Sequence, residues 1–177
     1  MIAEFSLRPK AQNKRALYLL IAFAIGAAAF AIWYIATPVY RGVIGLGAMA
    51  FVIAAVFMYT KFIAVSYSYD IFIANDTPLF TVRQLTGKRE TTLCRIELRG
   101  ITSVVRMTPE ERKGHKTPTG YVKYNYCPTI GPDVTYMITY VTRYEKAEIT
   151  IEANDEFADI LMRYADEARG NYVDDEF

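Results

Sequence analysis

Two long apolar segments near the N-terminus constrain the fold of this chain more than any other feature. Ala16 to Ala36 is an uncharged run of 21 residues, and a second run extends from Gly42 to Thr60. As helices rising 1.5 Å per residue, both runs match the roughly 30 Å hydrocarbon core of a bilayer. The sequence therefore predicts two transmembrane helices, at 16–36 and 42–60.

The linker Thr37 to Arg41 is too short for anything but a tight turn. Pro38 lacks an N–H and disfavours a helical Thr37, so the first helix is expected to end there. An antiparallel membrane hairpin over residues 16–64 follows. A cleaved signal peptide is the alternative for the first run, but that run exceeds a typical signal h-region and no persuasive A-x-A site follows it.

Basic residues predict which side of the membrane the ends of the chain occupy. They precede the first helix and follow the second at Arg8, Lys10, Lys14, Arg15 and Lys61, whereas the turn carries only Arg41. The positive-inside rule then predicts a multi-pass protein of the cell membrane with both termini in the cytosol. Cys94 and Cys127 would lie in a reducing compartment, and we expect free thiols in strands.

Small residues recur at helical spacing on both predicted helices and would let the two backbones approach closely. They are Ala22 and Gly26 on the first helix, and Gly47, Ala50 and Ala54 on the second. Packing within the hairpin is the simpler interpretation. Contact with the helices of another membrane protein is the alternative.

From about Val65 the apolar pattern alternates, as in half-buried strands separated by turns. Strands are expected at 66–73, 79–85, 90–98, 101–107, 121–127, 134–142 and 145–152. A helix over Asn154 to Arg169 follows, with Asn154 as N-cap and an apolar stripe. The stripe comprises Phe157, Ile160, Leu161, Tyr164 and Ala168. The expected organisation is a basic N-terminal segment at 1–15, the hairpin at 16–64, a β-rich domain at 65–170 and an acidic tail at 171–177.

Three stretches of sequence stand out within this order of elements: Phe80 to Val105, with a Gly-basic hairpin and an I-x-L-x-x-I step; Tyr124 to Tyr126; and Ile149 to Leu161. Together with the order of elements, they resemble a pleckstrin-homology-like (PH-like) domain. More closely, the chain resembles bacterial PH-like membrane proteins, in which a two-helix anchor precedes the domain. The resemblance implies a seven-stranded antiparallel barrel or sandwich, capped by a C-terminal helix and held at a membrane.

Catalytic and metal-binding motifs are absent from the sequence, so we expect neither an enzyme nor a cofactor. The single histidine, His115, lies between Lys113 and Lys116 and is expected to be solvated. Glu145, Glu148 and Glu152 are expected on a hairpin or strand surface, without a partner in a pocket.

Charge is strongly polarised along the predicted domain. Residues 83–123 contain ten Lys or Arg and four acids, whereas residues 145–177 contain three bases and eleven acids. Lys88, Arg89, Arg112, Lys113 and Lys116, on two loops, are candidates for contact with anionic lipid or an acidic partner. Ordinary solvated hairpin tips are the alternative. Specific inositide recognition is not expected, because the first hairpin carries Asn75 and Asp76 and no base.

The leading functional hypothesis is a non-enzymatic, membrane-anchored interaction module that presents its PH-like domain to a protein partner at the cytosolic face. The alternatives are an anionic-lipid sensor working through the basic loops, and an accessory subunit of a membrane transporter or envelope complex. Nucleic-acid binding is not expected, because the chain has a membrane anchor and a pI of about 7.7.

Overall fold

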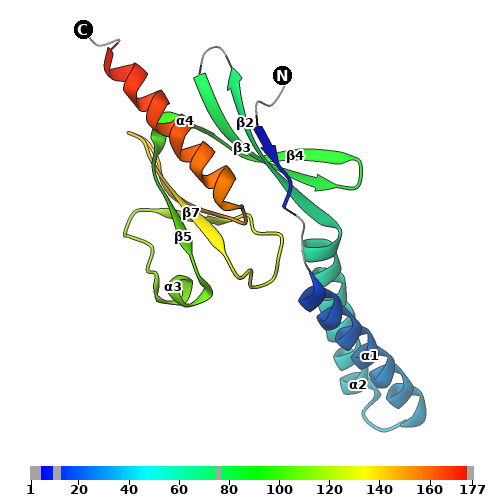
Figure 1. Ribbon diagram of the computed structural model, residues 1–177. Helices are drawn as coiled ribbons and strands as arrows, with labels where there is room; N and C mark the ends of the chain where they lie inside the picture. The colour runs from blue at the N-terminus through cyan, green and yellow to red at the C-terminus, as the bar shows by residue number, and fades with distance from the viewer. Residues whose placement is uncertain (1–4, 10–12, 75–76, 175–177) are drawn as a thin grey trace. The chain divides into compact units, whose positions relative to one another are not determined.

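The computed structural model describes residues 5–9, 13–74 and 77–174, with side chains described as far as residue 170. These residues belong to two compact units (Figure 1): residues 11–65, and residues 1–10 together with 66–177. The first unit is a helical hairpin and the second is a β-rich domain with a C-terminal helix. The turn predicted at Asn75 and Asp76, the base Lys10 and the last three residues of the acidic tail lie outside the described residues.

The hairpin consists of α1 (Lys14–Ala36), α2 (Arg41–Met58) and the π-helical turn η1 (Tyr59–Ile63), which continues α2. Lys14–Ala36 and Arg41–Ile63 are 23 residues each, long and apolar enough to cross a membrane. Many of their apolar side chains are exposed. An exposed apolar surface of this size is unusual for a protein in water. The most exposed include Ile25, Ile32, Ile35, Val43 and Leu46, all above 60%.

An aromatic side chain of each helix packs against a glycine of the other helix. A Cβ added to Gly26 would lie 2.6 Å from the Phe51 ring, and one added to Gly47 would lie 2.5 Å from the Phe30 ring. Phe30 and Phe51 also contact each other, with ring centroids 5.4 Å apart. The two glycines therefore accommodate rings that lock α1 against α2.

The first sheet of the β domain has the strand order β1-β2-β3-β4. Its strands are β1 (Phe5–Leu7), β2 (Val65–Ala74), β3 (Thr77–Thr86) and β4 (Arg89–Glu97). The pairing of β1 with β2 was not predicted. β1 precedes the helical hairpin in sequence but pairs antiparallel with the strand that follows it, with Phe5 opposite Ile71 and Leu7 opposite Tyr69. Because β1 has only three residues, an alternating apolar pattern cannot identify it as a strand in the sequence.

The second sheet has the order β5-β7-β8-β6. Its strands are β5 (Ile101–Met107), β6 (Val122–Asn125), β7 (Thr135–Val141) and β8 (Lys146–Ile151). The expected all-antiparallel arrangement is wrong here, because β6 runs parallel to β8, with Val122 opposite Ala147. The described strands therefore form two separate four-stranded sheets rather than a closed seven-stranded barrel. The long segments before and after β6 allow it to pair at this edge.

The core lies between the two sheets and α4 (Asp155–Asp174). Phe157 is fully buried near its centre, with ring centroids 6.0 Å from Phe5, 6.3 Å from Tyr69 and 6.4 Å from Phe80. The predicted N-cap is confirmed, since Asn154 Oδ1 accepts a 3.1 Å hydrogen bond from the Phe157 amide. Leu161 is also buried, so the apolar stripe of α4 faces the core as its spacing predicts.

Candidate functional site

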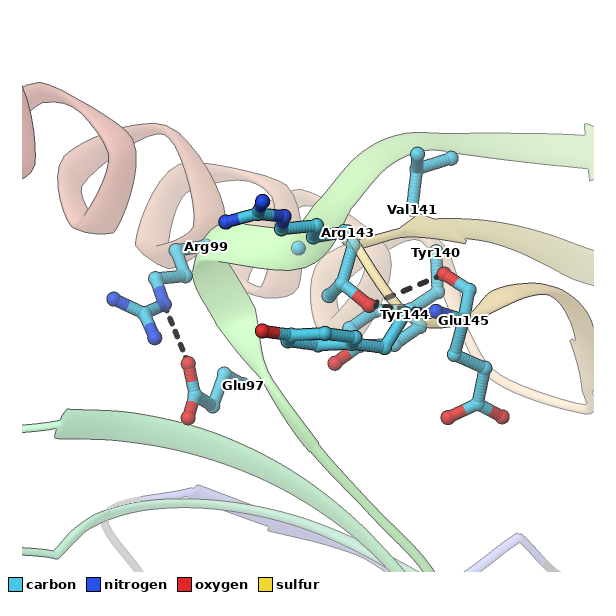
Figure 2. A pocket seen from close by; sticks show the side chains of 9 residues that line it. Glu97, Arg99, Tyr140, Val141, Arg143, Tyr144 and Glu145 are labelled. Carbon is cyan, nitrogen blue, oxygen red and sulfur yellow. Dashed lines mark hydrogen bonds and ion pairs between the residues drawn. The ribbon is translucent and has the colours of Figure 1, made fainter.

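A surface pocket of about 690 Å³ lies where the first sheet passes into the second (Figure 2). One wall comes from the end of β4 and the 3₁₀ turn η2 (Leu98–Gly100), and the other from the end of β7 and the turn between β7 and β8. The lining residues are Glu97, Arg99, Gly100, Tyr140, Val141, Thr142, Arg143, Tyr144 and Glu145. Its volume is in the range of small-ligand and peptide side-chain sites.

Local packing fixes the walls of this pocket. Gly100 is buried, and a side chain there would collide with the Tyr140 ring and lie 3.1 Å from Thr142 Cγ2. Thr142 also closes the β7–β8 turn: its amide donates to the Glu145 carbonyl at 2.8 Å, and its hydroxyl accepts from the Glu145 amide at 3.1 Å. The backbone of the turn is thereby held, while the side chains of Arg143 and Tyr144 stay exposed.

The pocket combines aromatic surface with charges of both signs. Tyr144 is 92% exposed, whereas Tyr140 is buried, and this burial raises the pKa of its phenol. Glu97 and Arg99 form an ion pair, while Arg143 has none among the described residues. Figure 2 shows the guanidinium groups of Arg99 and Arg143 toward one side and the Glu145 carboxylate turned away from them.

The residue types that line this pocket are typical of binding surfaces. Tyrosine and arginine are among the side chains enriched at the energetic centres of protein interfaces. Among the described residues, no group of three or more His, Cys, Asp or Glu could hold a metal ion. The pocket lining also contains no hydroxyl or thiol beside a histidine base, as nucleophilic catalysis would need.

The five predicted basic residues fall in two separate places. Lys88 and Arg89 are exposed at the turn between β3 and β4, whereas the other three lie on or just after α3 (Pro109–Gly114), a short helix in the connection from β5 to β6. Figure 1 shows this turn and α3 at well-separated parts of the domain. The five residues therefore do not form one patch.

Arg112 differs from the other four bases because its side chain is half-buried. Its Nη2 donates to the Pro132 carbonyl, and its Nε is buried without a partner. Arg112 thus packs the 126–134 connection against α3. Lys113 and Lys116 remain exposed.

The predicted helix-packing residues also divide into two groups. Gly26, Gly47 and Ala54 are half-buried, and the two glycines contact aromatic rings of the facing helix. Ala22 and Ala50 are exposed. The exposed pair leaves room for contact with another membrane protein.

His115 was expected to be solvated and Glu148 to lie on the surface without a partner, and both expectations are wrong. Glu148 is only 2% exposed, and its carboxylate accepts hydrogen bonds from His115 Nε2 at 2.9 Å and from the Thr117 hydroxyl at 2.8 Å. The segment 108–120 folds back over the outer face of β8 and buries the carboxylate. The lysines on either side of His115 in sequence gave no sign of this fold.

The segment that carries His115 had a readable signal that the sequence prediction missed. Thr108 and Glu111 form a capping box: the Thr108 amide donates to Glu111 Oε2 at 2.7 Å, and the Glu111 amide donates to the Thr108 hydroxyl at 3.4 Å. Pro109 is the first helical residue. The string T-P-E-E is therefore a helix start, although the segment was predicted to be a loop.

Cys94 and Cys127 are free thiols, half-buried in the domain. Burial raises the pKa of Cys94 to about 11 and that of Cys127 to about 12. Both thiols are therefore protonated at neutral pH, and neither has the lowered pKa of a reactive cysteine. Cys94 lies in β4 as predicted, whereas Cys127 lies just beyond β6.

No protein-family model, no curated protein and no solved structure matches this chain.

Proposed function

We propose that this protein is a non-enzymatic, membrane-anchored interaction module. In this proposal α1 and α2 cross the cell membrane as a hairpin, with both termini in the cytosol, and the β domain presents a binding surface to a protein partner there. Anchoring would confine the domain to the membrane plane and raise its effective concentration against other membrane proteins. The proposed fold of the domain is PH-like, extended by β1 and altered at β6, which runs parallel to β8.

The pocket beside the β7–β8 turn is the observation that carries this proposal. It brings a tyrosine that is 92% exposed next to an arginine without an ion pair in the described chain, and both residue types are enriched at the energetic centres of protein interfaces. Arg143 would suit a partner segment with a carboxylate, and the exposed ring of Tyr144 would suit its apolar side chains.

Photo-cross-linking in native membranes tests the proposal. A benzophenone amino acid at Tyr144 should yield a reproducible protein adduct, which Arg143→Ser should weaken. The matched control places the same amino acid at Val122, a half-exposed residue on β6 outside the pocket. Absence of any adduct from position 144, or equal adducts from both positions, would refute the assignment of this surface.

An accessory subunit of a transporter or envelope complex is the second candidate, favoured by the exposed Ala22 and Ala50. Ala50→Leu should then disrupt co-purification with the partner while leaving the adduct at position 144 unchanged. Retained co-purification in Ala50→Leu would remove this candidate.

A further inference from the structure

The turn between β3 and β4 carries an uncompensated positive charge. Thr86 and Arg89 pair across a two-residue turn in which Gly87 takes a positive φ of 60°, a conformation that favours glycine. Lys88 and Arg89 are both exposed, and within the described chain neither side chain has a hydrogen bond or ion pair. The adjacent acid, Glu90, is already paired with Arg83 at 2.9 Å. The tip therefore presents two free cations.

Strand direction places this tip at a particular end of the first sheet. β2 begins at Val65, directly after the helical segment that ends at Ile63. Because β3 follows β2 through a hairpin, the end of β3 and the turn beyond it lie at the end of the sheet where β2 begins. β1 also runs toward this end on its way to α1, since Leu7 lies opposite Tyr69.

A contact between β2 and β3 shows how far along the sheet the β3–β4 turn lies from the first residues of β2. Arg83 Nε on β3 lies 2.7 Å from Asp70 Oδ2 on β2. From there both strands run about 10 to 17 Å to the end of the sheet, at roughly 3.3 Å per residue: β3 continues to its turn, and β2 is followed back to Val65. The turn is therefore about level with the first residues of β2. This bound depends only on the sheet and the covalent chain, whatever the angle between domain and hairpin.

We propose that Lys88 and Arg89 bind the anionic headgroups of the bilayer that α1 and α2 span. The inference rests on the proposed membrane insertion, but not on the protein partner. A tip tethered within about 15 Å of the point where the chain leaves the helices lies within side-chain reach plus one or two Debye lengths of the headgroups. Each cation near an anionic leaflet should favour contact roughly fivefold, and the pair roughly 25-fold. Lys113 and Lys116, on α3 and the loop after it, have no such tether.

Energy transfer in the full-length chain tests this contact. Trp33→Phe removes the single native tryptophan, and Thr86→Trp, at an exposed residue, places a donor beside the tip. The protein is reconstituted in phosphatidylcholine vesicles, with or without about one third phosphatidylglycerol, that contain dansyl-labelled headgroups. Transfer should be higher in the anionic vesicles, and both high salt and the double variant Lys88→Ser/Arg89→Ser should lower it to the neutral level.

Two controls make the result decisive. Exchanging the bases as Lys88→Arg/Arg89→Lys should keep the anionic enhancement, and Lys113→Ser/Lys116→Ser should not alter it. Equal transfer in neutral and anionic vesicles, or an enhancement that survives loss of both tip cations, would overturn the proposal. Quenching of native Trp33 by brominated acyl chains reports insertion independently. If Trp33 is quenched but the tip shows no anionic enhancement, this inference alone is refuted. If Trp33 is not quenched, the proposed membrane anchor is refuted as well.

Discussion

At the scale of single residues, the features that matter most are two buried carboxylates on the outer faces of the sheets. Glu148 is held by His115 and Thr117, whereas Asp70 is held by Ser6, Ser68 and Arg83. Each joins segments distant in sequence: the 108–120 segment to β8, and β1 to β2 and β3. A buried carboxylate that keeps its charge needs such partners, because its desolvation would otherwise be costly.

Replacing His115 should show how much its contact with the buried Glu148 carboxylate stabilises the fold. His115→Ala leaves the Glu148 carboxylate with one side-chain donor, Thr117, and should lower the free energy of unfolding by about 1–2 kcal/mol. Lys116→Ala, next in sequence but exposed, should change it by less than about 0.5 kcal/mol. Denaturant unfolding in detergent, followed by near-UV circular dichroism, measures both. Equal stability of the two variants would show that the His115 contact contributes little.

The second site predicts a dependence on pH. Burial alone would raise the pKa of Asp70, but the Arg83 guanidinium and the Ser6 and Ser68 hydroxyls outweigh it, so the pKa lies below its usual value of 3.8. A lowered pKa stabilises the folded state above the unfolded-state pKa, and this contribution is lost as pH falls through the folded-state pKa.

Asp70→Asn should therefore lower the free energy of unfolding at pH 7 by about 1–3 kcal/mol, because charged hydrogen bonds are lost. The gap to the native chain should close below pH 3.8, where the native carboxyl becomes protonated. Asp133→Asn, at an exposed residue, is the control and should track the native chain throughout. A gap that stays constant with pH would contradict the assigned role of Asp70.

At the scale of elements, the distinctive parts are the helical hairpin and the two strands, β1 and β2, that flank it in sequence. The chain enters α1 from β1 and leaves η1 into β2, and these two strands pair with each other. Both ends of the hairpin are thus tied into one sheet. Inside the hairpin, two glycines and two phenylalanines interlock in reciprocal pairs.

Two glycines of α2 allow a matched test of this interlock. Gly47→Ala places a methyl group against the Phe30 ring and should destabilise the hairpin by about 1–3 kcal/mol, the usual cost of overpacking. Gly42→Ala meets nothing within 4 Å and should be neutral or slightly stabilising through its better helix propensity. Thermal unfolding in detergent compares the two. Similar midpoints for both variants would rule out the interlock as a source of stability.

At the scale of the whole molecule, the proposed topology is the claim with the widest consequences. It decides which leaflet the β3–β4 turn meets and which compartment supplies a partner to the pocket. The basic residues that flank the hairpin support a cytosolic domain, because the α1–α2 turn carries only Arg41.

Cysteine accessibility in intact cells tests this topology. With Cys94 and Cys127 replaced by serine, Val39→Cys in the α1–α2 turn should react with an impermeant maleimide added outside. Lys88→Cys in the β3–β4 turn should react only after permeabilisation. The opposite pattern would invert the orientation, and labelling of both positions from outside would rule out a cytosolic domain.

Sequence patterns alone predict the two long apolar helices, the break at Pro38, most strands of the domain and the capped C-terminal helix. These are set by interactions among near neighbours: continuous apolar character, a missing N–H, alternation along a strand, and an Asn154 side chain bonded to the amide three residues on. The helix start T-P-E-E also depends on near neighbours, so the sequence was sufficient to predict it.

Where β1 and β6 pair, which bases are exposed and which polar groups are buried depend on tertiary packing. Phe5–Leu7 pairs with a strand more than sixty residues away, and His115 meets Glu148 across 33 residues. Lys88 and Arg112 look alike in sequence, yet one ends exposed at a turn while the other folds onto the Pro132 carbonyl. Pairings at such separation depend on how whole elements pack, and no local pattern records them. The two apolar segments thus predict a membrane anchor, while the packing of the domain determines which surfaces that anchor presents.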